Sequence, residues 1–299
     1  MKTLTLNSFA KLNLYLSVRN KLSDGYHSLQ TVFERINVCD KVVLRVRRDD
    51  KIVCLCDDPG LPADSRNLAV KAALLLSRRY AVGKGATIRL IKRIPQGAGM
   101  AGGSSNAAAV LIGLNRLWRL GLSKAELCSI ASRVGSDVAF FIHECRFALA
   151  EGKGEKVRPV RELRKRLLWH VILVPDLHAS TPLIYKQWDK LRANKNIDIS
   201  RLTRPVSGAK LILSALRQKS GHWLEQCLFN GLEAAAIDLY PGLARVRRVL
   251  TMAGVPNICM TGSGSAFFGI VSSRKEALRF SRRLKKLNRR WHVFVARTV

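Results

Sequence analysis

One glycine-rich stretch of the sequence has the composition of an anion-binding loop. Residues 97–109 read GAGMAGGSSNAAA, so four glycines and two serines come directly before an alanine-rich run with helical character. Glycine lets the backbone approach a ligand closely, and the free N–H groups and dipole of a helix start attract phosphate oxygens. Ser104 and Ser105 add hydroxyl groups that can cap the helix, contact a phosphate or contact its metal ion. The stretch predicts a polyphosphate-binding loop, with an ordinary tight connection as the alternative.

Two common phosphate-binding patterns do not fit this stretch. A Walker A loop requires Gly-Lys-Ser/Thr after four spacer residues, and none is present here. Gly97, Gly99 and Gly102 match the spacing of dinucleotide-binding loops, which is a weak signal by itself. Such a loop also needs an acidic residue about 20 residues further on, whereas residues 118–124 read WRLGLSK. A nicotinamide site of that type is therefore excluded.

The elements around the loop form a mixed pattern of strands and helices. Asp24-Gly25 predicts a turn between two β-type segments, and the capping-box spacing of Ser123 and Glu126 predicts a helix start. Apolar periodicity, together with Gly and Pro residues that end elements, marks the other segments. These signals predict β-type segments at 1–18, 31–56, 86–94 and 169–174, and helices at 67–80, 104–119 and from 123 to about 135. We therefore expect an α+β fold.

The length of the chain predicts two domains. Its 299 residues exceed the roughly 250 residues beyond which a single core rarely grows. Residues 151–166 are rich in Glu, Lys, Arg and Gly, which is typical of a domain junction. The predicted domains are residues 1–157, which contain the glycine-rich loop, and residues 158–299.

Composition narrows the classes of protein that fit. Hydrophobic residues make up 47% of the chain, but no run of 18 apolar residues occurs, so a membrane helix is not expected. The first 18 residues alternate apolar and polar types instead of forming a signal-peptide core, which favours a cytoplasmic protein. Seven cysteines without a CxxC pair are typical of reduced thiols and not of a zinc site.

The strongest compositional signal is a formal net charge of +31. A basic surface favours anionic partners such as nucleic acid, acidic membrane or phosphorylated metabolites. The most basic run lies at 274–290, where apolar residues recur every three or four positions and predict a helix with one core face. Its Lys and Arg residues then cover the solvent side, so nucleic-acid binding is the less favoured alternative. The predicted core face consists of Ala277, Phe280, Leu284, Leu287 and Trp291.

The glycine-rich stretch also resembles the loop of a known family. Residues 95–108, PQGAGMAGGSSNAA, are similar to the Pro-x-x-x-Gly-Leu-x-Ser-Ser-Ala loop of the GHMP kinases, which include galactose, homoserine, mevalonate and phosphomevalonate kinases. The extra glycines resemble one branch, the 4-diphosphocytidyl-2-C-methyl-D-erythritol kinases, although Met100 and Ala101 depart from its usual Gly-Leu-Gly-Gly-Gly-Ser-Ser. The resemblance implies an ATP-binding loop with a magnesium contact at Ser105. The implied loop residues are Pro95, Gly97, Gly99, Met100, Ala101, Gly102, Gly103, Ser104 and Ser105.

Five further segments continue the resemblance along the chain. Residues 10–14 resemble the family's Ala-Lys-Ile-Asn-Leu strand, and residues 24–27 resemble its Asp-Gly-Tyr/Phe-His. Residues 135–141 resemble Gly-Ser/Ala-Asp-Val-Pro-Phe-Phe, with Ala139 in place of the usual Pro. Residues 180–185 resemble Ser/Pro-Thr-Pro-x-Ile/Val-Phe/Tyr, and residues 260–266 resemble the C-terminal glycine motif.

These segments imply roles for individual residues. Lys11 and Asp137 become the catalytic residues, with Asp137 as the acid–base group, although an Asp after Gly-Ser also caps helices often. Asn67 and Leu68 resemble the pair beside the adenine pocket. Tyr26 and Tyr185 would enclose a cytosine whose polar edge bonds to His27, since base recognition needs an aromatic face and a directional polar partner. The implied acceptor-binding residues are Asn13, Tyr26, His27, Thr181 and Tyr185.

The resemblance therefore implies a two-domain α+β GHMP kinase fold with the active site in the cleft between the domains. The implied reaction uses ATP and Mg²⁺ to phosphorylate the 2-hydroxyl of 4-diphosphocytidyl-2-C-methyl-D-erythritol, a small-molecule partner, in the non-mevalonate isoprenoid pathway. Two alternatives stay open at this point. One is a GHMP kinase that acts on another small alcohol, and the other is a basic nucleic-acid-binding protein.

Overall fold

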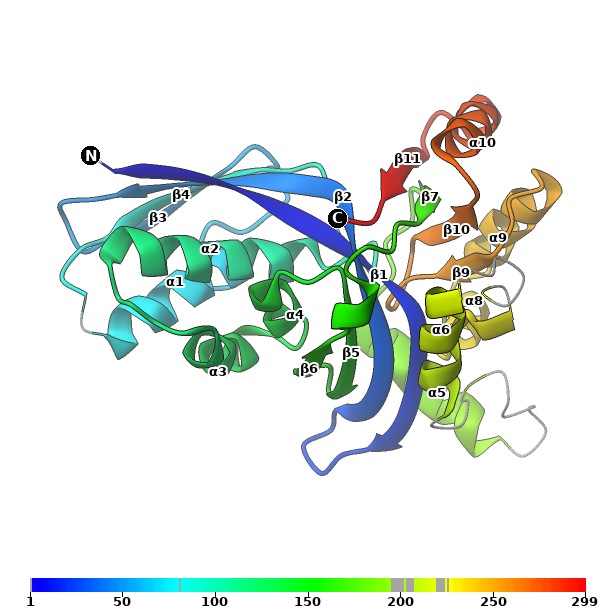
Figure 1. Cartoon of the computed structure of the whole chain (residues 1–299), viewed down its shortest axis with the longest axis horizontal. Coiled ribbons are helices and arrows are strands. Elements are labelled where there is room, and N and C mark those ends of the chain that lie inside the picture. The colour runs from blue at the N-terminus through cyan, green and yellow to red at the C-terminus, as the bar shows by residue number, and fades with distance from the viewer. Residues whose placement is uncertain (1, 81, 195–201, 203–206, 219–223, 225) are drawn as a thin grey trace.

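The computed structural model describes residues 2–80, 82–194, 202, 207–218, 224 and 226–299. Its fold contains two β-sheets with helices packed on both, in agreement with the expected α+β class (Figure 1). The larger sheet has the order β3-β4-β2-β1-β8, with β5 also paired to β2 and β6 to β5. Its strands are β1 (Thr3–Lys21), β2 (His27–Val46), β3 (Ile52–Cys56), β4 (Ala86–Ile91), β5 (Phe147–Gly152), β6 (Lys156–Pro159) and β8 (Phe229–Asn230).

Two long antiparallel strands, β1 and β2, form the centre of the larger sheet. They are joined by the predicted turn, in which Gly25 has a φ of 84°. The first half of β2 pairs with β5, and its second half pairs with β4. The β-type segment predicted at 31–56 consists of most of β2 followed by β3, with a bend at 47–51 between them. This arrangement places Lys11 and Asn13 in the middle of β1.

Four helices cover one face of this half of the larger sheet (Figure 1). The helix starts predicted at 67 and 123 are confirmed, because the Asn67 side chain accepts a hydrogen bond from the N–H of Ala69, and Ser123 and Glu126 form a complete capping box. The helix predicted from 104 begins two residues earlier, at Gly102. Alternate strand side chains such as Val42 and Leu44 pack against the apolar helix faces. The helices are α1 (Leu68–Arg79), α2 (Gly102–Trp118), α3 (Lys124–Val134) and α4 (Val138–His143).

The C-terminal half contains a four-stranded antiparallel sheet of order β11-β7-β10-β9. Val171 and Leu173 of β7 pack with the helices α5, α8, α9 and α10, whereas Ile172 and Val174 pack with β1 and α6 on the opposite face. The remaining elements are β7 (Trp169–Val174), β9 (Ile258–Met260), β10 (Phe267–Val271), β11 (His292–Arg297), the 3₁₀ helix η1 (Arg161–Leu163), α5 (Thr181–Ala193), α6 (Ser207–Gln218), α8 (Glu233–Leu239), α9 (Gly242–Met252) and α10 (Arg274–Leu287).

The two halves are joined by shared strands as well as by packing. β8 lies in the C-terminal half but pairs in parallel with β1. The predicted boundary between residues 157 and 158 falls inside β6, which pairs with β5 up to Pro159. The domain limits themselves stay a prediction.

One strand is shorter than its sequence predicts. The β-type segment 86–94 ends as a strand at Ile91. The cause is Asp40, a fully buried residue whose carboxylate accepts hydrogen bonds from the backbone N–H groups of Arg93 and Ile94 at 2.7 and 2.8 Å. These two N–H groups are therefore directed to a side chain instead of a neighbouring strand.

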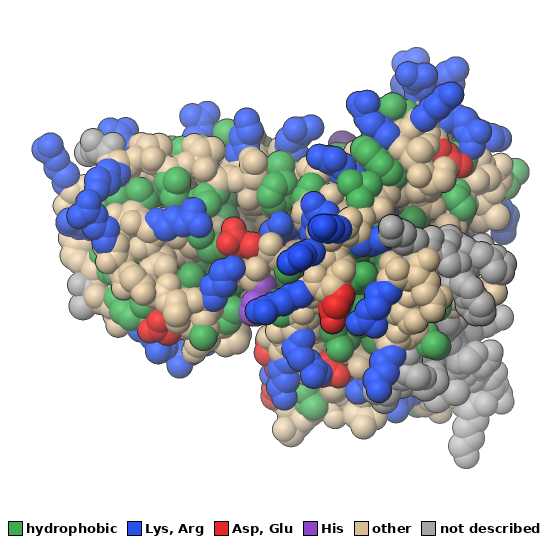
Figure 2. All heavy atoms as spheres, in the orientation of Figure 1, with side chains coloured by type: hydrophobic (Ala, Val, Ile, Leu, Met, Phe, Trp, Pro, Cys, Tyr) green, Lys and Arg blue, Asp and Glu red, His purple; other side chains and the backbone are tan. Residues whose placement is uncertain are grey.

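The basic helix α10 has the predicted core face over most of its length. Ala277, Phe280 and Leu284 are buried against the smaller sheet, while Leu287, the last residue of the helix, is 58% exposed. Its Lys and Arg side chains face solvent, and Figure 2 shows such side chains gathered at the upper right, where Figure 1 places α10. None of the seven cysteines, all of which lie in the described part of the chain, forms a disulfide bond. Among the described helices, none is both long and apolar enough to cross a membrane.

Candidate active site

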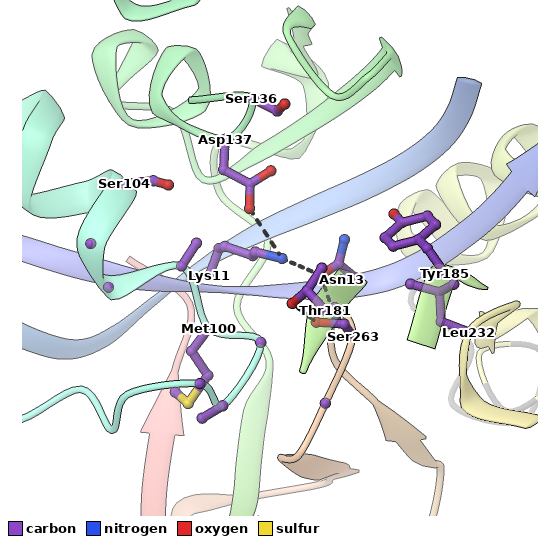
Figure 3. Close-up of a pocket in the computed structure, with 18 of the residues that line it drawn as sticks. Lys11, Asn13, Met100, Ser104, Ser136, Asp137, Thr181, Tyr185, Leu232 and Ser263 are labelled. Carbon is purple, nitrogen blue, oxygen red and sulfur yellow. Dashed lines mark hydrogen bonds and ion pairs between the residues drawn. The ribbon is translucent and has the colours of Figure 1, made fainter. Parts of the chain in front are cut away.

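A large cavity lies where β1, the glycine-rich loop and the C-terminal half meet. Its volume is about 1030 Å³, at the upper end of the roughly 300–1,000 Å³ that small-molecule sites occupy. The lining comes from β1, the turn at 24–27, residues 94–104, the start of α4, α5 and the turn at 262–264. Every predicted site residue except Ser105 lines this cavity, and Figure 3 shows how the central side chains face one another.

The glycine-rich loop bends tightly into the start of α2. Gly97 and Gly99 have φ values of 62° and 72°, and Ala101, which precedes the helix, has a φ of 55°. No side chain caps this helix start, so its first N–H groups remain available to a ligand. The departure of Ala101 from the family's glycine is accommodated, because the residue adopts the left-handed conformation that glycine would provide at lower cost.

The loop packs directly on the glycine-containing turn of the C-terminal half. A Cβ atom on Gly99 would lie 2.0 Å from the carbonyl oxygen of Thr261, so no larger residue fits without moving one of the two segments. The N–H groups of Ser265 and Ala266 donate to the carbonyls of Gly97 and Ala98 at 3.2 and 3.3 Å. These contacts hold the two segments together along one side of the cavity.

The predicted catalytic pair is brought together beside this loop. Lys11 Nζ lies 3.5 Å from Asp137 Oδ2 and also donates to Asn13 Oδ1 (Figure 3). The side chain of Lys11 is buried, and burial lowers the pKa of its ammonium group, an effect that the neighbouring Asp137 carboxylate opposes. The carboxylate of Asp137 makes no capping hydrogen bond to α4. The helix-capping alternative is therefore not realised, and the carboxylate faces Lys11 and the cavity.

Asn13 connects the pair to the rest of the site. Its Nδ2 group donates to Thr31 Oγ1 at 2.8 Å, and its Oδ1 atom accepts from the N–H of Gly262 at 2.9 Å. The backbone N–H of Asn13 donates to Thr261 Oγ1 at 3.0 Å. One buried amide thus joins β1, β2 and the C-terminal turn, and fixes where the ammonium group of Lys11 lies.

An aromatic cluster forms the end of the cavity away from the glycine-rich loop. The His27 ring stacks on Tyr185 with centroids 5.1 Å apart and contacts the edge of Trp188. Its Nε2 atom lies 2.6 Å from Asp189 Oδ1. Burial raises the pKa of Asp189, but hydrogen bonds from His27 and Lys21 outweigh it, so the pKa lies below its usual value. Burial also raises the pKa of the Tyr185 phenol, which stays neutral.

Tyr26 differs from its neighbour His27 in its exposure. Its side chain is 60% exposed at the mouth of the cavity, and the Lys153 ammonium group lies 4.6 Å from the centre of its ring. Lys153 also forms an ion pair with Asp24 in the same turn. On the opposite wall, Thr181 at the start of α5 forms a hydrogen bond of 2.6 Å with Ser263.

The structure places the two serines of the loop in different environments. Ser105 is buried, and its Oγ atom accepts a hydrogen bond of 2.8 Å from Ser8, so it does not line the cavity. This placement disagrees with the magnesium contact expected from Ser105. The reason is helical geometry, because consecutive residues of a helix point about 100° apart. Ser104 is the serine that faces the cavity (Figure 3).

Asn67 and Leu68 line the cavity near the start of α2, as expected for residues beside a nucleotide. The Asn67 side chain is already occupied, since it accepts from the N–H of Ala69 and donates to the carbonyl of Pro62, both at 3.0 Å. Its contribution is therefore to shape the wall. A ligand would therefore contact Asn67 and Leu68 by van der Waals packing alone.

The fold also brings to the cavity charged residues that the sequence did not predict there, among them Asp189, Lys153 and Lys92. Asp189 lies four residues after Tyr185 on α5, and this helical spacing is the signal that could have indicated it. Lys153 lies in the segment interpreted as a domain junction, and Lys92 follows β4. The Lys92 ammonium group is paired with the buried Asp40 and donates to Asn106 Oδ1 at 3.1 Å. Neither lysine carries a local signal of its position.

Comparison with known proteins agrees with this arrangement. The model of the GHMP kinases N terminal domain matches residues 67–144, and that of the GHMP kinases C terminal region matches residues 212–290. The 4-diphosphocytidyl-2-C-methyl-D-erythritol kinase of Bacillus licheniformis is 37% identical over 271 residues, which cover 90% of this chain and 89% of that protein. The kinase of the same description from Symbiobacterium thermophilum is 37% identical over 97% of this chain and 98% of its own. A crystal structure of 4-(cytidine 5'-diphospho)-2C-methyl-D-erythritol kinase is 31% identical and superposes with a TM-score of 0.79, over 99% of this chain and 100% of that one.

Proposed function

We propose the function of this chain from its family, because the chain belongs to the GHMP kinases and, among them, to the 4-diphosphocytidyl-2-C-methyl-D-erythritol kinases. It transfers the γ-phosphoryl group of ATP to the 2-hydroxyl of 4-diphosphocytidyl-2-C-methyl-D-erythritol, a step of the non-mevalonate isoprenoid pathway. The observation that carries this proposal is the Lys11–Asp137 pair, which faces the glycine-rich loop across one cavity.

ATP fits the glycine-rich end of the cavity. Gly97 and Gly99 allow the loop to pack closely against His178 and Thr261, and the uncapped N–H groups of α2 provide donors for phosphate oxygens. Asn67 and Leu68 form the adjacent wall. We assign the polyphosphate to the loop and the adenine to this wall.

The opposite end of the cavity suits a cytosine. Because Asp189 accepts the hydrogen of His27 Nε2, a neutral His27 has its Nδ1 lone pair left to accept a hydrogen bond. Cytosine offers a matching donor in its exocyclic amino group, which uracil lacks. Tyr26 and Tyr185 supply the apolar faces. Asp189 is thus a positioning residue that sets which hydrogen-bonding group of His27 meets the base.

The chemical step requires little beyond orientation and charge neutralisation. The acceptor hydroxyl oxygen forms a bond to the γ-phosphorus as the bond to the β-phosphate oxygen breaks, and ADP leaves. Asp137 orients the hydroxyl and receives its proton. Lys11 holds the Asp137 carboxylate in place and offsets the charge of the phosphoryl group being transferred.

Oxygen donors suited to magnesium are present at this point of the cavity. The Ser104 hydroxyl and the Asp137 carboxylate are the hard oxygen ligands that this ion prefers. The described residues contain no group of three or more His, Cys, Asp or Glu side chains placed to hold a metal by themselves. ATP phosphates and water would complete the coordination, as is usual for magnesium. The ion supplies charge neutralisation at the phosphates when bound.

An ADP-release assay with a panel of alcohols tests the proposal. The purified protein is given ATP and, separately, the cytidyl substrate, mevalonate, homoserine and galactose. We expect kcat/KM for the cytidyl substrate to exceed that for each other alcohol by at least about 100-fold, since the aromatic end binds only the nucleotide-bearing acceptor. A higher kcat/KM with another alcohol would assign the chain that substrate instead, and no ADP release with any of them would overturn kinase activity.

A further inference from the structure

A second cavity lies at the far end of α2 from the glycine-rich loop. Its volume is about 790 Å³, and it shares no lining residue with the active-site cavity. The 17 residues of α2 separate the two cavities by about 25 Å at 1.5 Å per residue. The lining comes from the segment before β1, the bend after β2 and the ends of α1 and α2. Figure 2 shows Lys and Arg side chains at this end of the molecule, where Figure 1 labels the N-terminus.

The lining is strongly cationic and contains no acidic residue. It includes five basic side chains, of which Arg47 alone is paired, with both oxygens of Asp49 at 2.6 Å. The other four have no carboxylate partner within the part of the chain that the structure describes. The two helix ends contribute only about half a negative charge each, so roughly three positive charges remain uncompensated. The five basic residues are Lys2, Arg47, Arg48, Lys84 and Arg119.

One of these cations, Arg119, occupies an energetically costly backbone conformation. Arg119 follows α2 and has a φ of 59°, in the left-handed region where glycine is favoured at helix ends. A non-glycine residue costs about 1–2 kcal/mol in this conformation. The nearest following glycine is Gly121, two residues later, so the strained position itself carries an arginine.

The lining also contains two half-buried aromatic residues, Tyr80 and Trp118. An aromatic face beside several cations is the combination that binds a base and its phosphates together. The volume lies within the roughly 300–1,000 Å³ range of small-ligand sites, and three uncompensated charges match a di- or triphosphate.

We propose that this cavity is a second nucleotide-binding site, which holds a di- or triphosphate through Arg48, Lys84 and Arg119. The base packs against Tyr80 and Trp118. The ligand is a free nucleotide, because a nucleotide unit inside a single-stranded nucleic acid carries one phosphodiester and no di- or triphosphate. This site is independent of the proposed kinase reaction.

Calorimetric titration of the whole protein with ATP, without an acceptor substrate, tests the proposal. The cavity variant carries Arg48→Glu, Lys84→Glu and Arg119→Glu, at three exposed positions. The control variant carries Lys275→Glu, Arg282→Glu and Lys286→Glu, which change the net charge equally on the exposed side of α10. We expect the cavity variant to lose one binding event per chain relative to wild type, with kcat/KM unchanged, and the control variant to lose none.

Two results would overturn the proposal, namely equal stoichiometry in the wild type and the cavity variant, or the loss of one binding event in both variants.

Arg119→Gly provides a variant that folds, because glycine relieves the left-handed strain while it removes the cation. Its affinity at the second site is expected to fall about 3- to 10-fold, and unchanged affinity would count against the site. A parallel titration with UTP and with a 12-residue oligouridylate checks this choice of ligand. UTP binding as tight as the oligomer or tighter supports the free nucleotide, and oligomer binding more than about 10-fold tighter would overturn it in favour of single-stranded nucleic acid.

Discussion

The contact between the glycine-rich loop and the C-terminal turn makes Gly99→Ala the most informative substitution. The new Cβ atom would lie 2.0 Å from the Thr261 carbonyl oxygen, so the two segments must separate by more than about 1 Å to reach an ordinary contact. The left-handed backbone adds a cost of about 1–2 kcal/mol. Ala101 bears this cost at a φ of 55° in the same loop, so the steric overlap is the larger obstacle.

The magnitude of the effect follows from the contacts that would be lost. Separation breaks the hydrogen bonds from Ser265 and Ala266 to the loop, each worth about 0.5–1.5 kcal/mol. With the backbone strain, the substitution destabilises the protein by about 2–5 kcal/mol. An unfolding entropy near 2.1 cal/mol/K per residue makes this a fall in Tm of about 3–8 °C. The displaced loop should also raise KM for ATP by about 10-fold or more.

Gly103→Ala is the matched control for this prediction. Gly103 lies in the first turn of α2, and the nearest atom to a Cβ there is Leu68 Cδ1 at 3.7 Å. Alanine favours a helix by up to about 1 kcal/mol over glycine, so Tm should stay constant or rise. Both values come from thermal unfolding of the unliganded proteins. A Tm for Gly99→Ala within about 1 °C of wild type, or an equal loss in Gly103→Ala, would refute the close approach of the two segments.

Three further predictions concern the two ends of the active site. Asp137→Asn should lower kcat by at least about 100-fold with little change in acceptor binding, and undiminished turnover of the purified variant would remove Asp137 from the mechanism. Burial lowers the pKa of Lys11, so kcat/KM should fall at alkaline pH with an apparent pKa below 10.5, as the lysine loses its proton and its attraction for Asp137. If the same alkaline fall in kcat/KM persists in Lys11→Arg, it belongs to another group. Asp189→Asn should raise KM for the cytidyl substrate about 3- to 10-fold and leave KM for ATP unchanged. The control Lys21→Met removes an exposed partner of the same carboxylate and should change neither KM by more than about 3-fold. Equal effects of the two substitutions would contradict the positioning role of Asp189.

The predicted local structure was confirmed where a short-range rule determines it. The helix that begins after Asn67, the capping box at Ser123, the turn at Gly25 and most of the buried face of α10 all follow from spacing within a few residues. The end of β4 could not be predicted, because Asp40, more than 50 residues away, supplies the hydrogen-bond acceptor. The predicted face of α10 extends too far, because Leu287 is its exposed last residue and Trp291 lies beyond the helix.

The short motifs of the sequence are enough to predict which residue types line the site, because each motif is a short run whose residue types suit phosphate, base or proton transfer. The tertiary structure decided which of those side chains can act. It turned Ser104 toward the cavity and Ser105 into the core, left the Asp137 carboxylate uncapped beside Lys11, and brought Asp189 to His27 from 162 residues away. The direction and burial of each side chain depend on packing between segments that are distant in the sequence, and the spacing of residues along the chain does not specify that packing.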